Sequence, residues 1–398
     1  MERYVQDPEP PAAATMPRLR LGVVADPGLP SDIAAAVVNE RLPPLLSRRV
    51  SDEVVWEVEL EQQELPLDEH GTVPLLELAG ERRPEAGWDM FVYLTDLPRG
   101  PAAQPVLADL SSRDQAALIS LPAIGGVRLR HHVTRALVHI VDRLHHSTAR
   151  PAGRRALRRW SEWTSSVRER TSDEHALDTS LVLVGRRGTF RLLCGMVRNN
   201  RPWRLVPHLA SATAAAAATA AFGIFYSSIW QMADAMSTLR LTVVTLLAIG
   251  VMVGWLLFYN HLWDSPRGNR ARKDTVLYNA STLCTLALGV SCMYLLLYGL
   301  ALLAAVVVID DGFLGSQLGH PAGASDYATV VWLACSMGIV AGALGSSLDS
   351  EAAVRQATYS KREQERQARN RRRAEQSEDR HSAADDRSLA PDDRSPSS

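Results

Sequence analysis

"VLYNASTLCTLALGVSCMYLLLYGLALLAAVVVID" runs from Val276 to Asp310 and contains 34 residues without a charged side chain before the first aspartate. A helix that spans a bilayer needs roughly 20 apolar residues, so the stretch is either one long helix or two short ones. A division near Gly289 would leave a first piece of 14 residues, and no Pro or Asn-Gly turn is available to reverse the chain. We therefore predict one helix, about 51 Å long at ~1.5 Å per residue, which must tilt or protrude from the bilayer.

Three further segments are long and apolar enough to cross a bilayer. They are about Leu205–Met232, Leu241–Asn260 and Tyr327–Leu348. Together with Val276–Ile309 they predict an all-α, four-helix transmembrane domain over residues 201–350.

The charges of the connecting loops predict the orientation. The connection 261–274 carries Arg267, Arg270, Arg272 and Lys273, whereas residues 310–326 carry no Lys or Arg. After the last span, residues 355–373 contain eight basic and two acidic side chains. With four spans, every basic flank lies in the cytoplasm, in agreement with the positive-inside rule. We expect a multi-pass protein of the bacterial inner membrane with both termini cytoplasmic.

Small residues recur at helical spacing inside these apolar segments. They form two groups, Gly250/Gly254 and Gly338/Gly342/Gly345. Such groups allow two helices to pack closely, either as the seam of a homo-oligomer or inside one four-helix bundle. The spans carry no Asp, Glu, Lys or Arg in their middle, and proton- or ion-coupled carriers usually need such groups.

Residues 18–200 alternate between strand and helix patterns. Buried-type strands such as Leu19–Asp26 and Trp88–Asp96 are separated by amphipathic helical segments. This alternation predicts an α/β cytoplasmic head with a mostly parallel sheet and Rossmann-like layers. We expect the head to fold on its own, ending near Ser172 or Asn199. Residues 1–17 and the end of the basic tail 351–398 have the composition of disordered segments.

Polar side chains at predicted strand ends form the first candidate site. Asp26, Asp96 and Asp109 each stand near the end of a strand, and Thr95 precedes Asp96. Ligands of open α/β sheets bind beyond the carboxyl ends of the strands, so these residues could hold Mg²⁺ or a polar ligand. Asp is also a common turn and cap residue after a strand.

The sequence "VGRRGTF", Val184–Phe190, is the second candidate site. It predicts a strand, a Gly-x-x-Gly turn and the start of a helix, where backbone N–H groups and arginines attract an anion. The residues concerned are Gly185, Arg186, Arg187, Gly188 and Thr189. The alternative is a plain turn near the membrane, since a four-residue glycine pattern is weak and no Walker ending follows.

The segment Pro151–Arg170 combines tryptophans and arginines at helical spacing. It suits a helix in the membrane interface that binds anionic lipid, and it equally suits a helix docked on the head. The lipid-facing candidates are Arg154, Arg155, Arg158, Arg159, Trp160 and Trp163. His139, Asp142 and His146 share a helix face, for which we expect a solvated basic surface rather than a metal site. No nucleic-acid partner is expected, and no cofactor is indicated.

Several stretches resemble an uncharacterised family of bacterial membrane proteins: "LGVVADPGLPSD", "VPLLELAGERR", "WDMFVYLTDLPR", "LISLPAIGGVRLR" and "AGALGSSLDSEAAVRQATYSKREQER". The resemblance covers most of the chain and implies the same plan of α/β head, four spans and basic tail. Some members carry the label methylenetetrahydrofolate dehydrogenase. Enzymes of that class use a catalytic Lys after a Tyr and a "PGGVGP"-like loop. Here the two lysines are Lys273 and Lys361, both outside the head, and the loop is absent.

These patterns favour a non-enzymatic, regulatory or scaffolding membrane protein whose head binds a small ligand or a protein partner. A transporter or channel component is the first alternative. A membrane-tethered enzyme that uses the strand-end crevice is the second.

Overall fold

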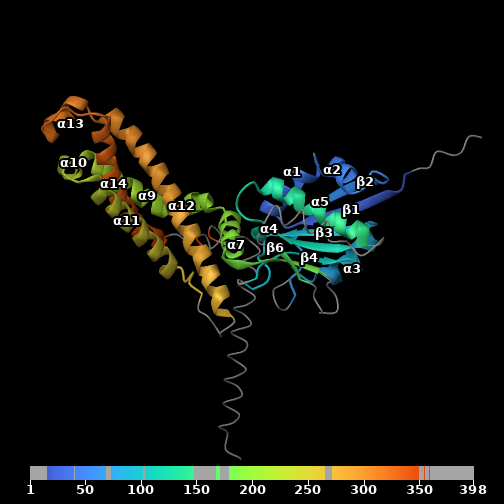
Figure 1. Cartoon of the computed structure of the whole chain (residues 1–398). Helices are drawn as coiled ribbons and strands as arrows, with labels where there is room; N and C mark the ends of the chain where they lie inside the picture. The colour runs from blue at the N-terminus through green and yellow to red at the C-terminus, as the bar shows by residue number, and fades with distance from the viewer. Residues whose placement is uncertain are drawn as a thin grey trace, which may run out of the picture.

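The computed structural model describes residues 16–39, 41–68, 73–101, 104–147, 167–170, 179–264 and 271–348, together with Val354 and Thr358. Nearly all of the predicted N-terminal and C-terminal disordered segments therefore lie outside the described residues. The described chain forms an α/β head at one end and a bundle of long helices that extends away from it (Figure 1).

A seven-stranded sheet, with the order β2-β1-β3-β5-β4-β7-β6, forms the centre of the head. The strands are β1 (Arg18–Ala25), β2 (Val55–Gln62), β3 (Met90–Thr95), β4 (Val106–Ser111), β5 (Ala116–Ser120), β6 (Val167–Arg170) and β7 (Thr179–Leu183). The first four strands in this order pair in parallel, and the pairings β5–β4, β4–β7 and β7–β6 are antiparallel. The sheet is therefore mixed, and the prediction of a mostly parallel sheet holds only for one half of it.

Two local features produce the antiparallel half. Residues 112–115 alone connect β4 to β5, and parallel neighbours need a crossover of a dozen residues or more. The predicted helix Pro151–Arg170 is wrong at its end, because Val167–Arg170 is the edge strand β6. Its alternating burial follows the period of two that a half-buried strand shows. The remainder of that segment, 151–166, lies outside the described residues.

Helices cover both faces of the sheet. One face packs against α1 (Leu29–Val38), α2 (Leu42–Arg49) and α5 (Leu129–Ser147), and the other packs against α3 (Leu75–Ala86). Every residue of β3 is buried, as expected for a strand that is covered on both faces.

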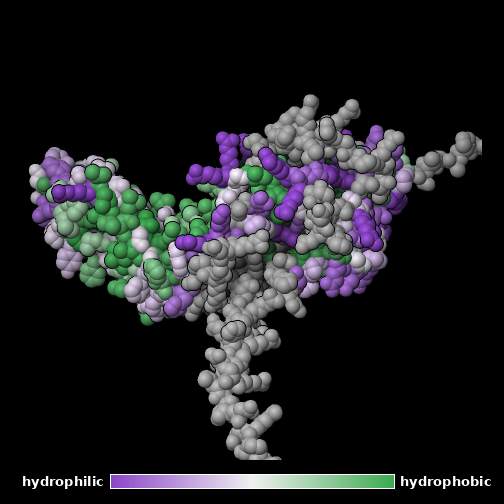
Figure 2. Space-filling model, turned by 60° about the horizontal axis from the view of Figure 1, so that its bottom comes forward, coloured by the Kyte–Doolittle hydropathy of each residue, from purple (hydrophilic) through white to green (hydrophobic). Residues whose placement is uncertain are grey.

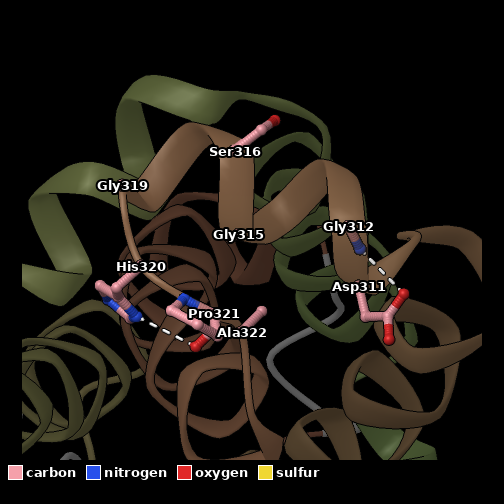
Figure 3. Close-up of a pocket in the computed structure, with 8 residues that line it drawn as sticks. All are labelled: Asp311, Gly312, Gly315, Ser316, Gly319, His320, Pro321 and Ala322. Atoms are coloured by element: carbon pink, nitrogen blue, oxygen red, sulfur yellow. Dashed lines mark hydrogen bonds between the residues drawn. The ribbon is translucent and has the colours of Figure 1, made fainter.

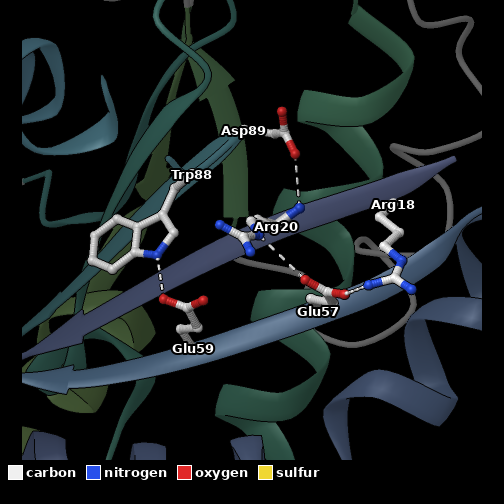
Figure 4. A network of polar contacts seen from close by, with 6 residues as sticks. All are labelled: Arg18, Arg20, Glu57, Glu59, Trp88 and Asp89. Carbon is white, nitrogen blue, oxygen red and sulfur yellow. Dashed lines mark hydrogen bonds and ion pairs between the residues drawn. The ribbon is translucent and has the colours of Figure 1, made fainter. Parts of the chain in front are cut away.

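A polar network holds β2 and β3 to β1 near the start of these strands (Figure 4). The guanidinium of Arg20 pairs with Glu57 at 3.2 Å, and its backbone N–H donates to Asp89 at 2.8 Å. Trp88 lies over Gly22, where an added Cβ would come within 2.1 Å of the indole. A side chain at position 22 would therefore displace Trp88 from the sheet.

In the described part of the chain, the bundle contains four main helices and two short helices at its far end. They are α9 (Ala210–Phe225), α10 (Ser227–Asp234), α11 (Thr238–Tyr259), α12 (Ala271–Val308), α13 (Asp311–Leu318) and α14 (Ala324–Gly345). Among the described residues, α11, α12 and α14 are long and apolar enough to cross a membrane, and a fourth span results if Gly185–His208 and Ala210–Phe225, bent by 60°, count as one. Hydrophobic side chains dominate the visible surface of this part, whereas the head is mostly hydrophilic (Figure 2). The chain thus has the architecture of a multi-pass membrane protein.

The opening stretch forms one helix, as predicted. The 38 residues of α12 continue without a break. The helix protrudes beyond the bundle, because Leu277 and Tyr278 pack into the core of the head. By contrast, the segment Leu205–Met232 is not one helix: the short α8 (Leu205–His208), α9 and α10 follow each other, with non-helical backbone at Leu209 and Tyr226.

The two groups of glycines have different surroundings. An added Cβ on Gly338 would lie 2.5 Å from the carbonyl oxygen of Ala216, and one on Gly342 would lie 2.9 Å from that of Ala212. Gly338, Gly342 and Gly345 therefore form the seam between α14 and α9 of the same chain. Gly250 and Gly254 have nothing within 4 Å of an added Cβ in the described part of the chain. Self-association through this second pair stays a prediction.

Candidate functional site

The carboxyl ends of β1, β3, β5 and β7 meet at one edge of the sheet, since these four strands run in the same direction. We call this the carboxyl edge. It is the place where open α/β sheets usually bind ligands. Asp26 follows β1, and Thr95 and Asp96 stand at the end of β3, so the structure brings three of the four predicted strand-end residues together.

The side chains of Asp26 and Thr95 form hydrogen bonds within the chain. Asp26 is fully buried. Its carboxylate accepts a hydrogen bond from the Tyr93 hydroxyl and another, at 3.3 Å, from the backbone N–H of Asp96. The Thr95 hydroxyl oxygen accepts the N–H of Leu97 at 3.1 Å. Asp96 is 6% exposed. Buried carboxylates that receive hydrogen bonds from nearby groups fix the local backbone, which is the role that this geometry supports directly.

The helix α7 (Gly185–Asn199) covers the carboxyl edge. It starts right after β7 and passes the end of β5, where the Arg191 guanidinium donates to the carbonyl of Ile124 at 2.8 Å. Burial lowers the pKa of this guanidinium. The helix ends at β3, where the Asn199 amide donates to the carbonyl of Asp96 at 3.1 Å. The backbone of α7 packs closely on the backbone that follows β5: an added Cβ on Gly195 would lie 1.9 Å from the Pro122 carbonyl oxygen.

The connection from α7 continues directly into the bundle. Arg201 pairs with Asp32 of α1 at 2.5 Å, and the Asn200 amide donates to the Thr285 hydroxyl of α12 at 3.1 Å. Gly289 of α12 lets Leu205 pack against it, since an added Cβ would lie 2.6 Å from that side chain. We call the carboxyl edge, α7 and the first half of α12 the junction (Figure 1). Head and bundle are packed together there over a continuous surface.

Asp109 does not belong to this edge, so the prediction that grouped it with Asp26 and Asp96 is wrong. It lies inside the antiparallel strand β4 and pairs with Leu118, which is two residues before the end of β5. Its carboxylate accepts from Arg99 at 3.0 Å and from the Ser180 hydroxyl at 2.6 Å. The direction of β4 explains the error, because an antiparallel strand carries its carboxyl end to the opposite edge.

The Gly-x-x-Gly candidate forms the first turns of α7, as predicted. Gly185 has φ +80° and is exposed together with Arg186 and Arg187. Gly188 is buried against Leu183, and Thr189 is partly buried. The turn therefore presents two arginines to solvent beside the junction, and an anion-binding role for it stays a prediction. The lipid-facing candidates Arg154, Arg155, Arg158, Arg159, Trp160 and Trp163 lie outside the described residues.

The other end of the bundle has a different surface, which we call the distal cap: α10, α13 and the connection 319–323. A shallow pocket of about 560 Å³ lies between α13 and this connection, bordered among others by Asp311, Ser316 and His320 (Figure 3). Next to it, ligand atoms of Asp234, His320 and Asp326 all lie within 4.8 Å of one another. The hydrogen bond to the Pro321 carbonyl, followed by that to Asp234, raises the pKa of His320.

No motif in the sequence predicted a polar cluster at the distal cap. The absence of Lys and Arg from residues 310–326 indicated only the orientation of the loop. Asp234 lies 86 residues before His320, so no local pattern connects the two. The available signal was the concentration of acidic, His and Gly residues in a loop between two apolar spans.

Comparisons of the chain with protein-family models, with curated proteins and with solved structures found no match. The fold alone therefore indicates the class of protein: a multi-pass membrane protein with an α/β head built on a mixed sheet.

Proposed function

We propose that this chain is a non-enzymatic, regulatory or scaffolding protein of the bacterial inner membrane, with four spans and both termini in the cytoplasm. The observation that carries the proposal is the position of α7 on the carboxyl edge. A substrate of an α/β enzyme would need this edge, and here Asn199 and Gly195 occupy it with the chain's own backbone and side chains.

The head then works through its outer surface and through its connection to the bundle. A small ligand or a protein partner that binds the head would act on α7, and α7 contacts α12 through Asn200 and Thr285. A contact network of this kind links two sites only when both bias the same element. The Rossmann-like arrangement of the four parallel strands, and the resemblance to bacterial four-span proteins, support the same plan.

Hydrogen exchange of the full chain in lipid nanodiscs tests whether the edge stays closed. The amides of Asp96, Leu97 and Met196–Asn199 should exchange slowly, because they are buried or helical at the junction. The exposed amide of Gly312 at the distal cap provides a fast-exchanging comparison. An excess of ATP or NAD⁺ should leave the slow amides unchanged. Rapid exchange at Asp96 and Leu97, or protection that appears only with a nucleotide, would favour the membrane-tethered enzyme.

The orientation is tested by cysteine labelling in intact cells. A cysteine at Ser316 should react with an impermeant maleimide from outside, since the proposed four-span topology puts the loop 310–326 outside and the basic connection 261–274 in the cytoplasm. A cysteine at Gly268 should react only after permeabilisation. The reverse pattern would contradict the proposed topology.

Anionic lipid is the proposed partner of the basic juxtamembrane segment, whose described part includes α7 and residues 200–204. Arg186, Arg187 and Arg204 are exposed there, and Trp203 is 55% exposed. Basic side chains near an anionic leaflet contribute about 1 kcal/mol each at low salt.

Thermal denaturation in nanodiscs tests this partner. Phosphatidylglycerol should stabilise the wild-type chain relative to phosphatidylcholine, and R186Q/R187Q/R204Q should lose that difference. The matched control R48Q/R49Q changes two exposed arginines of α2 and should keep it. Equal midpoints in both lipids for the wild type would refute the proposal.

A further inference from the structure

We propose that Asp234, His320 and Asp326 form a binding site for a divalent transition-metal cation of the Zn²⁺ type at the distal cap. The three residues come from three separate elements: the end of α10, the connection after α13 and the first turn of α14. Their ligand atoms lie within 4.8 Å of one another. The inference does not depend on the function of the head.

The geometry of His320 and Asp234 fits two ligands of one metal. Nε2 of His320 lies 3.4 Å from Oδ1 of Asp234. Two ligands that each lie about 2.0–2.1 Å from a zinc ion, at the tetrahedral angle, are separated by about 3.3–3.4 Å. A carboxylate oxygen of Asp326 lies within 4.8 Å of both of these atoms and would be the third ligand, with a water as the fourth.

The other ring nitrogen of His320 is placed as metal-binding histidines require. Nδ1 lies 3.2 Å from the carbonyl oxygen of Pro321, so a proton on Nδ1 can be donated to that oxygen. The lone pair of Nε2 is then directed toward Asp234. A backbone carbonyl commonly fixes the tautomer of a metal-ligating imidazole in this way.

The surrounding backbone positions these groups without help from the cluster. Gly319 ends α13 with φ +81°, which turns the chain back toward α10. Gly315 lets the connection lie close to α13, because an added Cβ would come within 3.0 Å of the His320 carbonyl oxygen. The Gln231 amide of α10 donates to the Gln317 carbonyl of α13 at 3.3 Å. Ligands held by such supports lose little conformational freedom on binding.

The donor set indicates the class of cation. One imidazole nitrogen and two carboxylate oxygens suit Zn²⁺ and neighbouring transition metals. Mg²⁺ and Ca²⁺ prefer oxygen ligands only. The competing interpretation is a surface ion pair between a protonated His320 and Asp234, which binds no metal.

Calorimetric titration distinguishes the two interpretations. The full chain, purified without a polyhistidine tag and treated with a chelator, is titrated with Zn²⁺ in detergent micelles. We expect one Zn²⁺ per chain and no heat from Mg²⁺ at the same concentration. H320Q, D234N and D326N should each weaken Zn²⁺ binding by at least about tenfold.

The matched control is H208Q. Like His320, His208 has its Nδ1 close to a backbone carbonyl, at 2.8 Å from that of Arg204. It does not belong to the Asp234–His320–Asp326 cluster. This variant should bind Zn²⁺ like the wild type. Thermal midpoints without metal should be similar for H320Q and D234N, because His320 and Asp234 are exposed. In D326N the asparagine keeps a side-chain oxygen that can accept the Gly323 N–H, as Asp326 does. Absence of Zn²⁺ binding by the wild type, or equal binding by all three cluster variants, would overturn the proposal. Cobalt substitution gives a second readout, since a tetrahedral Co²⁺ absorption band should appear in the wild type and vanish in H320Q.

Discussion

Acidic side chains are buried at the junction, whereas polar side chains are exposed at the distal cap. At the junction, Asp26 and Asp96 are almost completely withdrawn from water, and the Asp26 carboxylate accepts hydrogen bonds from the Tyr93 hydroxyl and the backbone N–H of Asp96. At the distal cap, Asp234 and His320 remain exposed beside an open pocket. The difference shows that acids at strand ends need not face solvent, because a later segment of the chain can cover them.

The largest expected effect tests how closely α7 packs on the carboxyl edge. In Gly195→Ala, the new methyl group would lie 1.9 Å from a backbone oxygen of Pro122, so α7 has to move away. Overpacking typically costs about 1–3 kcal/mol, and a backbone contact of this kind should reach the upper end or exceed it. Thermal denaturation of the full chain, together with faster exchange of the Asp96 amide, would measure the change.

Gly80→Ala is the control for that substitution. Gly80 lies inside α3, and nothing lies within 4 Å of an added Cβ in the described part of the chain. Alanine should therefore stabilise the helix by about 0.5–1 kcal/mol. If G195A and G80A behaved alike, the junction would be less tightly packed than its geometry indicates.

The second prediction concerns His139, a largely buried histidine of α5 in the head. Burial, with a smaller contribution from Arg143, lowers the pKa of His139 to about 4. The unfolded chain binds a proton there with a pKa near 6.5 and the folded chain does not, so stability falls as the pH drops from 6.5 toward 4. The loss at pH 5 should be about 2 kcal/mol.

Thermal denaturation at pH 8, 6.5 and 5 would measure this loss, and H139Q should reduce the pH dependence. His132, whose pKa is also lowered to about 4, chiefly by burial, should maintain part of it. H208Q, outside the head, should keep the wild-type pH dependence. An unchanged slope in H139Q would show that the ring is more hydrated than its position in α5 indicates. A reduced slope in H139Q would instead correct the expectation of a solvated basic face for this helix.

The smallest effect is expected at the ion pair between Arg201 and Asp32. Asp32 is 63% exposed, and exposed pairs contribute about 0–1 kcal/mol. R201Q should therefore lower the thermal midpoint only slightly, and high salt should remove the difference from wild type. A loss comparable to that of G195A would mean that charge, rather than packing, holds the head to the bundle.

Much of the architecture could be predicted from the sequence because it depends on local pattern. The uninterrupted apolar run identified α12 as a single helix, and strand–helix alternation identified an α/β head. The direction of β4 could not be obtained in the same way, since it depends on the short connection at residues 112–115 and on pairing with β7, which lies far along the chain.

The sites show the same limit. Thr95 and Asp96 are neighbours in the sequence, so their proximity could be predicted directly. Asp26 could be placed beside them because β1 and β3 are parallel. The covering of this edge by α7 depends on a contact between residues 103 positions apart, Asp96 and Asn199. The Asp234–His320–Asp326 cluster likewise requires that two helical hairpins meet, which no periodicity within either segment reveals.

The continuous α12 has a mechanical consequence. Its beginning is fixed in the head by Leu277 and Tyr278, and its later turns lie in the bundle. A spanning helix adapts to a thinner or thicker bilayer mainly by changing its inclination. Because α12 is one unbroken helix from the head into the bundle, a change of its inclination would move the head with it. A change in the thickness of the surrounding bilayer would thus change the angle between the head and the bilayer plane.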